Sequence, residues 1–226
     1  MPAVGHLGRL AGRYNGRFGS TGRQLIKLEY QDYLALREGA TVLERDPTGD
    51  KVLHLADGTF IKMFRRKRLI SSAAWYPYAQ RFADNAAALT RLGIPSPRVI
   101  AVYRITDIGR DAVHYHPLEG STLRDLWRNG LPPERERKLR KEFNLFVVHL
   151  HDLGVYFRSL HLGNVIVTPE GELGLIDISD MRIHRRPLGR FLRTRNLHRM
   201  ENTVGDCDWL EYELLLESAR GANKKR

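Results

Sequence analysis

Residues 157–180 read FRSLHLGNVIVTPEGELGLIDISD, and this is the most informative stretch of the chain. Asn164 comes directly before a short apolar run, Asp177 closes a second one, and the turn residues 169–172 separate them. The pattern predicts two neighbouring strands joined by a tight turn. Because Mg²⁺ prefers carboxylate and amide oxygens, Asn164 and Asp177 are candidate metal ligands at the ends of these strands.

The composition is that of an ordinary globular protein. The chain is 42% hydrophobic and 28% charged. Its 226 residues are enough for one compact domain, which can consist of two lobes. No run approaches the roughly 18–20 apolar residues of a membrane span, and residues 1–20 lack the apolar segment of a secretory signal. The single cysteine, Cys207, excludes an internal disulfide and a cysteine-based zinc site, and it fits a reducing compartment. A cytoplasmic location is therefore expected.

Basic residues are concentrated in clusters. The net charge is +11, from 37 Lys and Arg against 26 Asp and Glu. Residues 1–28 and 182–200 contain no acid, and the second segment holds seven arginines: Arg182, Arg185, Arg186, Arg190, Arg193, Arg195 and Arg199. Such clusters attract polyanions, whether nucleic acid, anionic lipid or a phosphorylated glycolipid, although generic surface charge is the simpler explanation.

The first half of the chain is expected to form a small sheet with a helix. Residues 1–28 form a glycine- and arginine-rich arm without a phosphate-loop motif. We predict a short helix at 30–38, antiparallel strands at 41–45, 51–55 and 59–64, and a helix over 68–92 that breaks near Pro77. Strands at 98–104 and 111–116 follow. In the third strand, Lys62 shares a face with Phe60 and Phe64, and a buried lysine there needs an anionic partner.

The second half is expected to be mainly helical. A connector at 116–120 leads to a short helix capped by Ser121, and 134–153 is the longest helical signal, with Leu139, Phe143 and Leu150 on its apolar stripe. The chain therefore divides into the arm at 1–28, an N-lobe at 29–117 and a C-lobe at 118–226.

The sequence motifs in residues 151–180 resemble those of the protein-kinase-like superfamily, and in detail those of the sugar and small-molecule kinases. Leu160, His161, Gly163 and Asn164 match the second half of their loop, roughly HGDLHxGN, and Ile176-Asp177-Ile178-Ser179 stands at their metal motif. With the FRRKR and GIPSP segments, this loop is similar to bacterial lipopolysaccharide core (Kdo/heptose) kinases, including toluene-tolerance-like proteins. The resemblance covers about residues 40–180. It implies an α+β, protein-kinase-like fold, with a small antiparallel N-lobe sheet, one helix and a short helical C-lobe.

The resemblance also implies a set of site residues. Lys62 matches the lysine that pairs with ATP phosphates, and Asn164 and Asp177 match the ligands of Mg²⁺. Asp84 is the only acid on the helix before Leu92 and is the candidate partner of Lys62. Backbone groups near His116 and Leu118 are expected to meet adenine, and His161 to support its loop.

Two departures from the family pattern bear on activity. Ser159 stands where such kinases carry the Asp that accepts the substrate proton, and a serine hydroxyl is not a base near neutral pH. Asp180 and Asp152 are candidate substitutes, and Arg158 adds positive charge for a phosphorylated acceptor. The usual glycine-rich loop is also absent, and Asp46 and Asp50 in its place would repel phosphates.

Three functions are compatible with these features. The first is an ATP- and Mg²⁺-dependent kinase of an inner-core sugar of lipopolysaccharide, acting on an anionic glycolipid at the inner face of the cytoplasmic membrane. The second is a pseudokinase, motivated by Ser159 and the missing glycine loop. The third, a nucleic-acid-binding protein, rests on charge alone, because the chain shows no nucleic-acid-binding motif. The sequence does not determine the oligomeric state.

Overall fold

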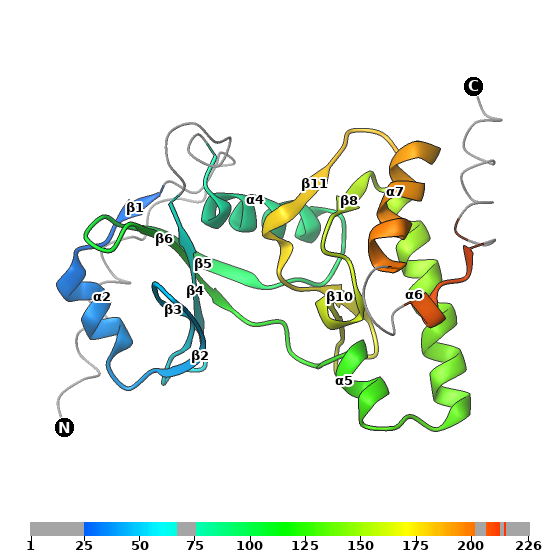
Figure 1. Ribbon diagram of the computed structural model, residues 1–226, viewed down its shortest axis with the longest axis horizontal. Coiled ribbons are helices and arrows are strands. Elements are labelled where there is room, and N and C mark those ends of the chain that lie inside the picture. The colour runs from blue at the N-terminus through cyan, green and yellow to red at the C-terminus, as the bar shows by residue number, and fades with distance from the viewer. Residues whose placement is uncertain (1–24, 67–75, 202–206, 213–214, 216–226) are drawn as a thin grey trace.

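The computed structural model describes residues 25–66, 76–201, 207–212 and 215. They form two lobes that lie side by side, with the N-terminal sheet in one lobe and most helices in the other (Figure 1). Most of the expected basic arm lies outside the described residues. Within them, no helix has both the length and the apolar content needed to cross a membrane.

The N-lobe is built on a six-stranded sheet with the order β1-β5-β6-β4-β3-β2. Its strands are β1 (Ile26–Lys27), β2 (Thr41–Asp46), β3 (Gly49–His54), β4 (Phe60–Arg65), β5 (Arg98–Ile105) and β6 (Arg110–His116). The five predicted strands are confirmed, and all of them pair antiparallel. The sixth, β1, pairs parallel with β5 and takes two residues that we assigned to the arm. A two-residue strand is too short to show alternation.

Strand β4 separates two apolar layers. Ile61 and Met63 are buried with Leu53 and Ala112 in a core that the short helix α2 (Tyr30–Arg37) covers through Tyr33. Phe60, Lys62 and Phe64 point to the opposite face, as the strand period of two requires. Helix α4 (Tyr78–Arg91) packs on this second face. The first part of the predicted helix, 68–76, falls almost entirely outside the described residues.

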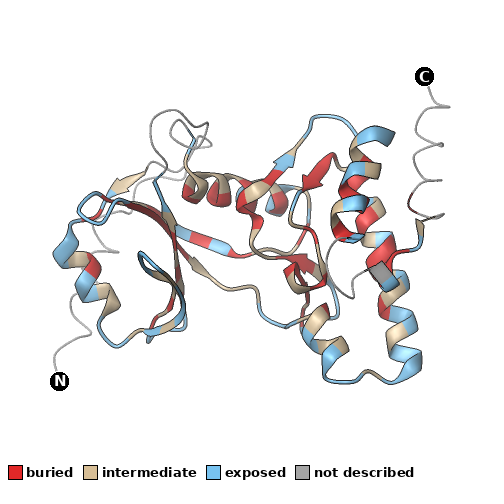
Figure 2. Cartoon of the chain, viewed as in Figure 1, coloured by how far each residue is buried: buried red, intermediate tan, exposed pale blue. Residues whose placement is uncertain are grey.

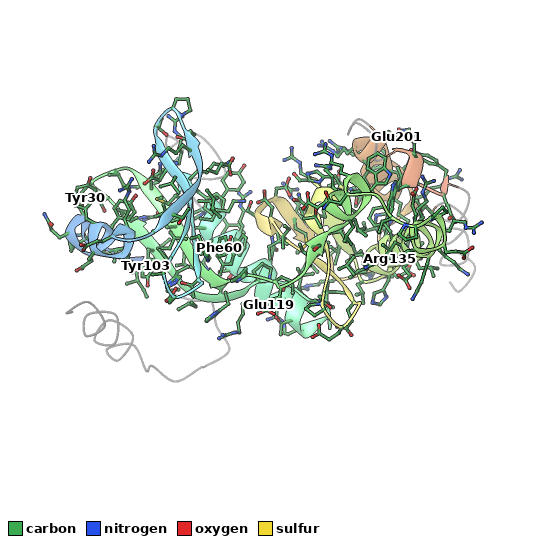
Figure 3. The ribbon with its side chains drawn as sticks, turned by 90° about the horizontal axis from the view of Figure 1, so that it is seen from below. Tyr30, Phe60, Tyr103, Glu119, Arg135 and Glu201 are labelled. Atoms are coloured by element: carbon green, nitrogen blue, oxygen red, sulfur yellow. The ribbon has the colours of Figure 1, made fainter. Side chains whose placement is uncertain are left out.

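The chain leaves the sheet at His116 and enters the second lobe at Ser121. Figure 3 shows Glu119 on the segment between the lobes. The second lobe contains β7 (Ser121–Thr122), α5 (Leu123–Arg128), α6 (Pro133–Asp152), β8 (Val155–Phe157), β9 (Val165–Val167), β10 (Leu173–Leu175), β11 (Met181–Ile183) and α7 (Arg190–Glu201). Single 3-10 turns lie at Leu162–Asn164, Ile178–Asp180 and Cys207–Trp209.

The expected cap of α5 was off by one residue. Ser121 belongs to β7, and Thr122 is the N-cap, with its Oγ1 accepting from the backbone N–H of Asp125 at 3.0 Å. A threonine oxygen in this position replaces one of the hydrogen bonds that a helix start lacks.

A single apolar core joins the lobes. Phe82 and Leu89 of α4 pack in the same cluster as Val113 of the sheet and Leu150 and Phe157 of the second lobe. Figure 2 shows exposed residues on the outer sides of α6 and α7, whereas α4 is mostly buried or intermediate. The predicted α+β class, with a small sheet lobe and a mainly helical lobe, is confirmed.

Candidate nucleotide and metal site

A cleft of about 260 Å³ lies between the sheet lobe and the helical lobe. Its apolar walls come from both lobes: Phe60, Phe82, Pro97, Pro117, Leu118, Ile166 and Ile176. Its polar groups are Lys62, Tyr115, Asn164 and Asp177. A mostly apolar cleft with a few convergent polar groups is the usual form of a small-molecule site.

Lys62 and Asp177 meet across this cleft. Lys62 Nζ lies 2.6 Å from Asp177 Oδ1, although the residues are 115 positions apart. The Lys62 side chain is only 12% exposed, whereas that of Asp177 is 45% exposed. The anionic partner that a lysine between two phenylalanines requires is therefore Asp177, and its carboxylate still faces the open cleft.

Asp177 has an unusual backbone. With φ 53° and ψ 41°, it is the one non-glycine residue with positive φ in the described part of the chain. For such a residue the left-handed conformation costs about 1–2 kcal/mol, and it persists only where its neighbours impose it. The preceding residue is held by the bond from Ile176 N–H to the Asn164 carbonyl at 3.0 Å. The backbone thus fixes Asp177 beside Asn164.

Asn164 is buried, and a hydrogen bond that its side-chain amide donates fixes the orientation of that amide. Its Nδ2 donates to the carbonyl of Ser159 at 2.8 Å, so its Oδ1 is the end of the amide that remains for a ligand. One carboxylate and one amide oxygen are ligands that Mg²⁺ accepts when phosphate oxygens and water complete its shell. Asn164 and Asp177 fit that set. In the described residues no group of three or more His, Cys, Asp or Glu side chains could hold a metal by itself.

Ser159 lies next to this pair and contacts Asp180. Its Oγ donates to Asp180 Oδ2 at 2.5 Å. The other candidate substitute, Asp152, pairs with the fully buried guanidinium of Arg193 at 2.5 Å. Arg193 is thus one of the seven clustered arginines whose charge is compensated within the fold. Of the two acids considered for the missing base, only Asp180 is in contact with Ser159.

Asp84 does not reach Lys62. Its carboxylate accepts from Tyr76 Oη at 2.6 Å and Gln80 Nε2 at 2.9 Å. The expectation failed because the sequence does not fix the rotation of α4. The next residue, Asn85, is the buried polar contact of this helix, and its Nδ2 donates to the carbonyls of Ile178 at 2.6 Å and Met181 at 3.1 Å. Sequence reasoning missed Asn85, which joins α4 to the segment after Asp177.

The acids of the first turn are neutralised by arginines. Asp46 pairs with Arg110 at 2.9 Å, and the bonds from Arg110 and Thr48 hold the pKa of Asp46 far below its usual range. Asp50 pairs with Arg37 at 2.5 Å, and this guanidinium lowers the pKa of Asp50. Their charges are therefore compensated within the N-lobe, which weakens the expected repulsion of phosphates.

The connector contributes only part of what we expected. Leu118 lines the cleft, whereas His116 is not among its lining residues. The neighbouring Tyr115 does line it, and its ring packs against Phe60 and Phe82 at centroid distances of 5.9 and 5.1 Å. Burial, with the charge of Asp177, raises the pKa of Tyr115. The alternation of β6 could have indicated that Tyr115 and Val113 face this side of the sheet.

Comparisons with known proteins show a short sequence match and likenesses to solved structures. No family model matches the chain. A segment of 63 residues is 41% identical to the serine/threonine-protein kinase/endoribonuclease IRE1 of Oryza sativa subsp. japonica. The segment spans 27% of this chain and 7% of the length of that protein. The chain is also similar to the bifunctional kinase-methyltransferase WbdD, with a TM-score of 0.45 and 16% identity, over 76% of this chain and 42% of that one.

The two-lobe α+β arrangement is the one that the resemblance to kinases implied. Five antiparallel strands, the helix α4 between β4 and β5, and a mainly helical second lobe follow one another in the expected order along the chain. In protein kinases the corresponding lysine contacts the ATP phosphates and the corresponding aspartate holds Mg²⁺, whereas here Lys62 and Asp177 contact each other directly. The match to a more specific kinase family remains a prediction from the sequence.

Proposed function

We propose that the protein is an ATP-dependent kinase. The observation that carries the proposal is the convergence of Lys62, Asn164 and Asp177 at one cleft between the lobes. These are the cation and the two oxygen ligands that phosphoryl transfer from ATP requires. The apolar walls, including Phe60, Leu118 and Ile166, are suited to the flat faces of a nucleotide base.

Each residue has a distinct task in this proposal. Asp177 and Asn164 would hold Mg²⁺, which supplies charge neutralisation to the phosphates when it is bound. Lys62 would exchange its present partner, Asp177, for phosphate oxygens. Because Lys62 is nearly buried and held on the inner strand β4, its ammonium group is already positioned for that exchange.

Replacement of Asp177 tests the proposal directly. Asp177→Asn keeps a side chain that tolerates the left-handed backbone and removes the charge. We expect Mg²⁺-dependent ATP turnover to fall by about 10²-fold or more, with a similar loss for Lys62→Met. Asp107→Asn, in the exposed turn between β5 and β6, is the charge-matched control, and its ATP turnover should equal that of the parent protein. Equal turnover for the parent and Asp177→Asn would contradict the proposal.

We further propose an inner-core sugar of lipopolysaccharide as the acceptor. Support comes from the resemblance of residues 40–180 and from a basic face, defined as the exposed residues Arg182, His184, Arg185, Arg186, Arg190, Phe191, Arg195 and His198. A phosphorylated glycolipid at the inner surface of the cytoplasmic membrane would present negative charge to this face. Turnover that rises with dephosphorylated core oligosaccharide, and not with free hexoses, would support this acceptor.

A pseudokinase is the second candidate, and Ser159 is the observation that favours it. The cleft would then bind nucleotide without transferring phosphate. A thermal shift with ATP and Mg²⁺, without any turnover by the parent protein, is the result expected for this alternative. Sustained phosphorylation of the acceptor would exclude it.

A further inference from the structure

Ser159 and Asp180 are brought together by the pairing of β8 with β11. These strands are antiparallel, and Phe157 pairs with Met181. Ser159 follows Phe157 by two residues, and Asp180 directly precedes Met181, so both leave the same end of this small sheet. The 2.5 Å bond from Ser159 Oγ to Asp180 Oδ2 is the result. At that length it is a strong, charge-assisted hydrogen bond.

The pair is also tied to the candidate metal ligands. The carbonyl of Ser159 accepts from Asn164 Nδ2 at 2.8 Å, and Asp180 ends the 3-10 turn for which Asp177 is the N-cap. Ser159 therefore lies beside the two residues that would hold Mg²⁺. Ser159 as a whole is half-buried, and its bond to Asp180 is not fully enclosed by the core.

Within the part of the chain that the structure describes, hydrogen bonds satisfy only one of the two carboxylate oxygens of Asp180. Its Oδ1 is buried and has no hydrogen-bond partner among the described residues. An unsatisfied carboxylate oxygen costs stability, and such groups in folded proteins call for a reason. Asp152, by contrast, compensates the buried Arg193, which is a sufficient structural role.

We infer that Ser159 and Asp180 form a proton relay that replaces the missing catalytic aspartate; this inference rests on the proposed kinase function. In the step, the acceptor oxygen bonds to the γ-phosphorus while the bond from that phosphorus to the β–γ bridging oxygen breaks, and ADP leaves. The acceptor proton passes to Ser159 Oγ as the Ser159 proton passes to Asp180 Oδ2. Asp180 then returns its proton to water. Ser159 touches the acceptor, and Asp180 acts through it.

Single and double variants test the relay with two acceptors, water and dephosphorylated lipopolysaccharide core oligosaccharide. Ser159→Ala and Asp180→Asn should each lower kcat by about 10²–10⁴-fold and leave the KM for ATP unchanged. Because the two groups act as one unit, the double variant should lose little more than either single variant. Asp107→Asn is the control. Thermal shifts with ATP and Mg²⁺ establish that each variant is folded and binds nucleotide.

A rescue separates chemistry from structure. Ser159→Asp places a carboxylate next to the acceptor. The kcat of the double variant Ser159→Asp, Asp180→Asn should therefore be at least tenfold higher than that of Asp180→Asn alone. A purely structural role of Asp180 predicts no such recovery.

The possible results distinguish the relay from the kinase proposal. If the parent protein turns over ATP and both single variants stay within about threefold of it, the relay is wrong and the kinase proposal stands. If the parent protein binds ATP with Mg²⁺ and transfers phosphate to neither acceptor, both are wrong.

Discussion

Gly174 shows how a single residue shapes the cleft. It lies in β10, where the strand passes close to the connector and to the segment before β5. A Cβ added there would stand 2.5 Å from Leu118 Cδ2 and 2.6 Å from the carbonyl oxygen of Pro95. The leucine could move, but the Pro95 backbone accepts a bond from Leu175 N–H at 2.9 Å and is held in place. Any side chain at this position must therefore displace the wall of the cleft.

We predict that Gly174→Ala destabilises the protein by about 1–3 kcal/mol, which is typical of overpacking. It should also weaken nucleotide binding, because Leu118 lines the cleft. Gly189→Ala is the matched control, since a Cβ there would meet nothing within 4 Å and the backbone φ is not positive. Urea denaturation of the two variants measures the difference. Equal midpoints for both variants would show that this close approach does not matter.

At the scale of elements, the length of a pattern decided what the sequence could predict. Strands β5 and β6 extend over eight and seven residues, long enough for an alternating or continuous apolar pattern to be recognised, so both were expected. Strands β8 and β11 have three residues each and are strands only because Phe157 and Met181 pair, which no local pattern reveals. The candidate metal ligands were predictable from their place at strand ends. Asp84 was misassigned because the rotation of α4 depends on its packing.

A hydrogen-bond chain ties three elements of the second lobe. Asn196 on α7 donates from Nδ2 to the carbonyl of Phe157 on β8 at 2.7 Å. Its Oδ1 therefore accepts from His151 Nε2 on α6, at 3.1 Å. His151 is neutral in this arrangement, and its buried Nδ1 has no partner among the described residues. Burial, with the nearby charge of Arg193, lowers the pKa of His151 to about 4 against opposing effects of Asn196 and Asp152.

This network predicts a loss of stability in acid. In the unfolded chain His151 takes up a proton near its ordinary pKa of 6.5, and in the folded protein only near about 4. The unfolded state therefore binds more protons between these values, and stability falls as pH drops through that window, by on the order of 3 kcal/mol in total. His151→Gln should reduce the difference between urea midpoints at pH 7.5 and pH 5. Some difference should remain, because burial also lowers the pKa of His114.

The control for this prediction is on the same helix. His149 is exposed on α6, two residues from His151, and His149→Gln should keep the full pH dependence of the parent protein. If the urea midpoints of both variants differ by the same amount between pH 7.5 and pH 5, the hydrogen-bond network around His151 does not cause the loss of stability in acid.

On the scale of the whole molecule, charge is distributed unevenly. The described residues 181–200 carry no acid, and one of their arginines, Arg193, is buried and paired, so the remaining positive charge is mostly on the basic face. Phe191 lies within this face and is 75% exposed, the most exposed large hydrophobic residue described. An aromatic ring amid arginines is suited to an anionic lipid surface, because the ring enters the interface while the guanidinium groups meet headgroups.

We therefore predict that the full chain binds vesicles that contain anionic phospholipid and not purely zwitterionic vesicles. Arg185→Ser with Arg190→Ser should weaken cosedimentation by about 30-fold, since each basic residue near a surface contributes about 1 kcal/mol. Phe191→Ser should weaken it further, and added salt should reduce binding of the parent protein. Arg128→Ser with Arg135→Ser removes the same charge from exposed sites on α5 and α6 and should have little effect. An equal loss in that control pair, or equal binding to a short RNA at matched salt, would show that the attraction is only generic charge.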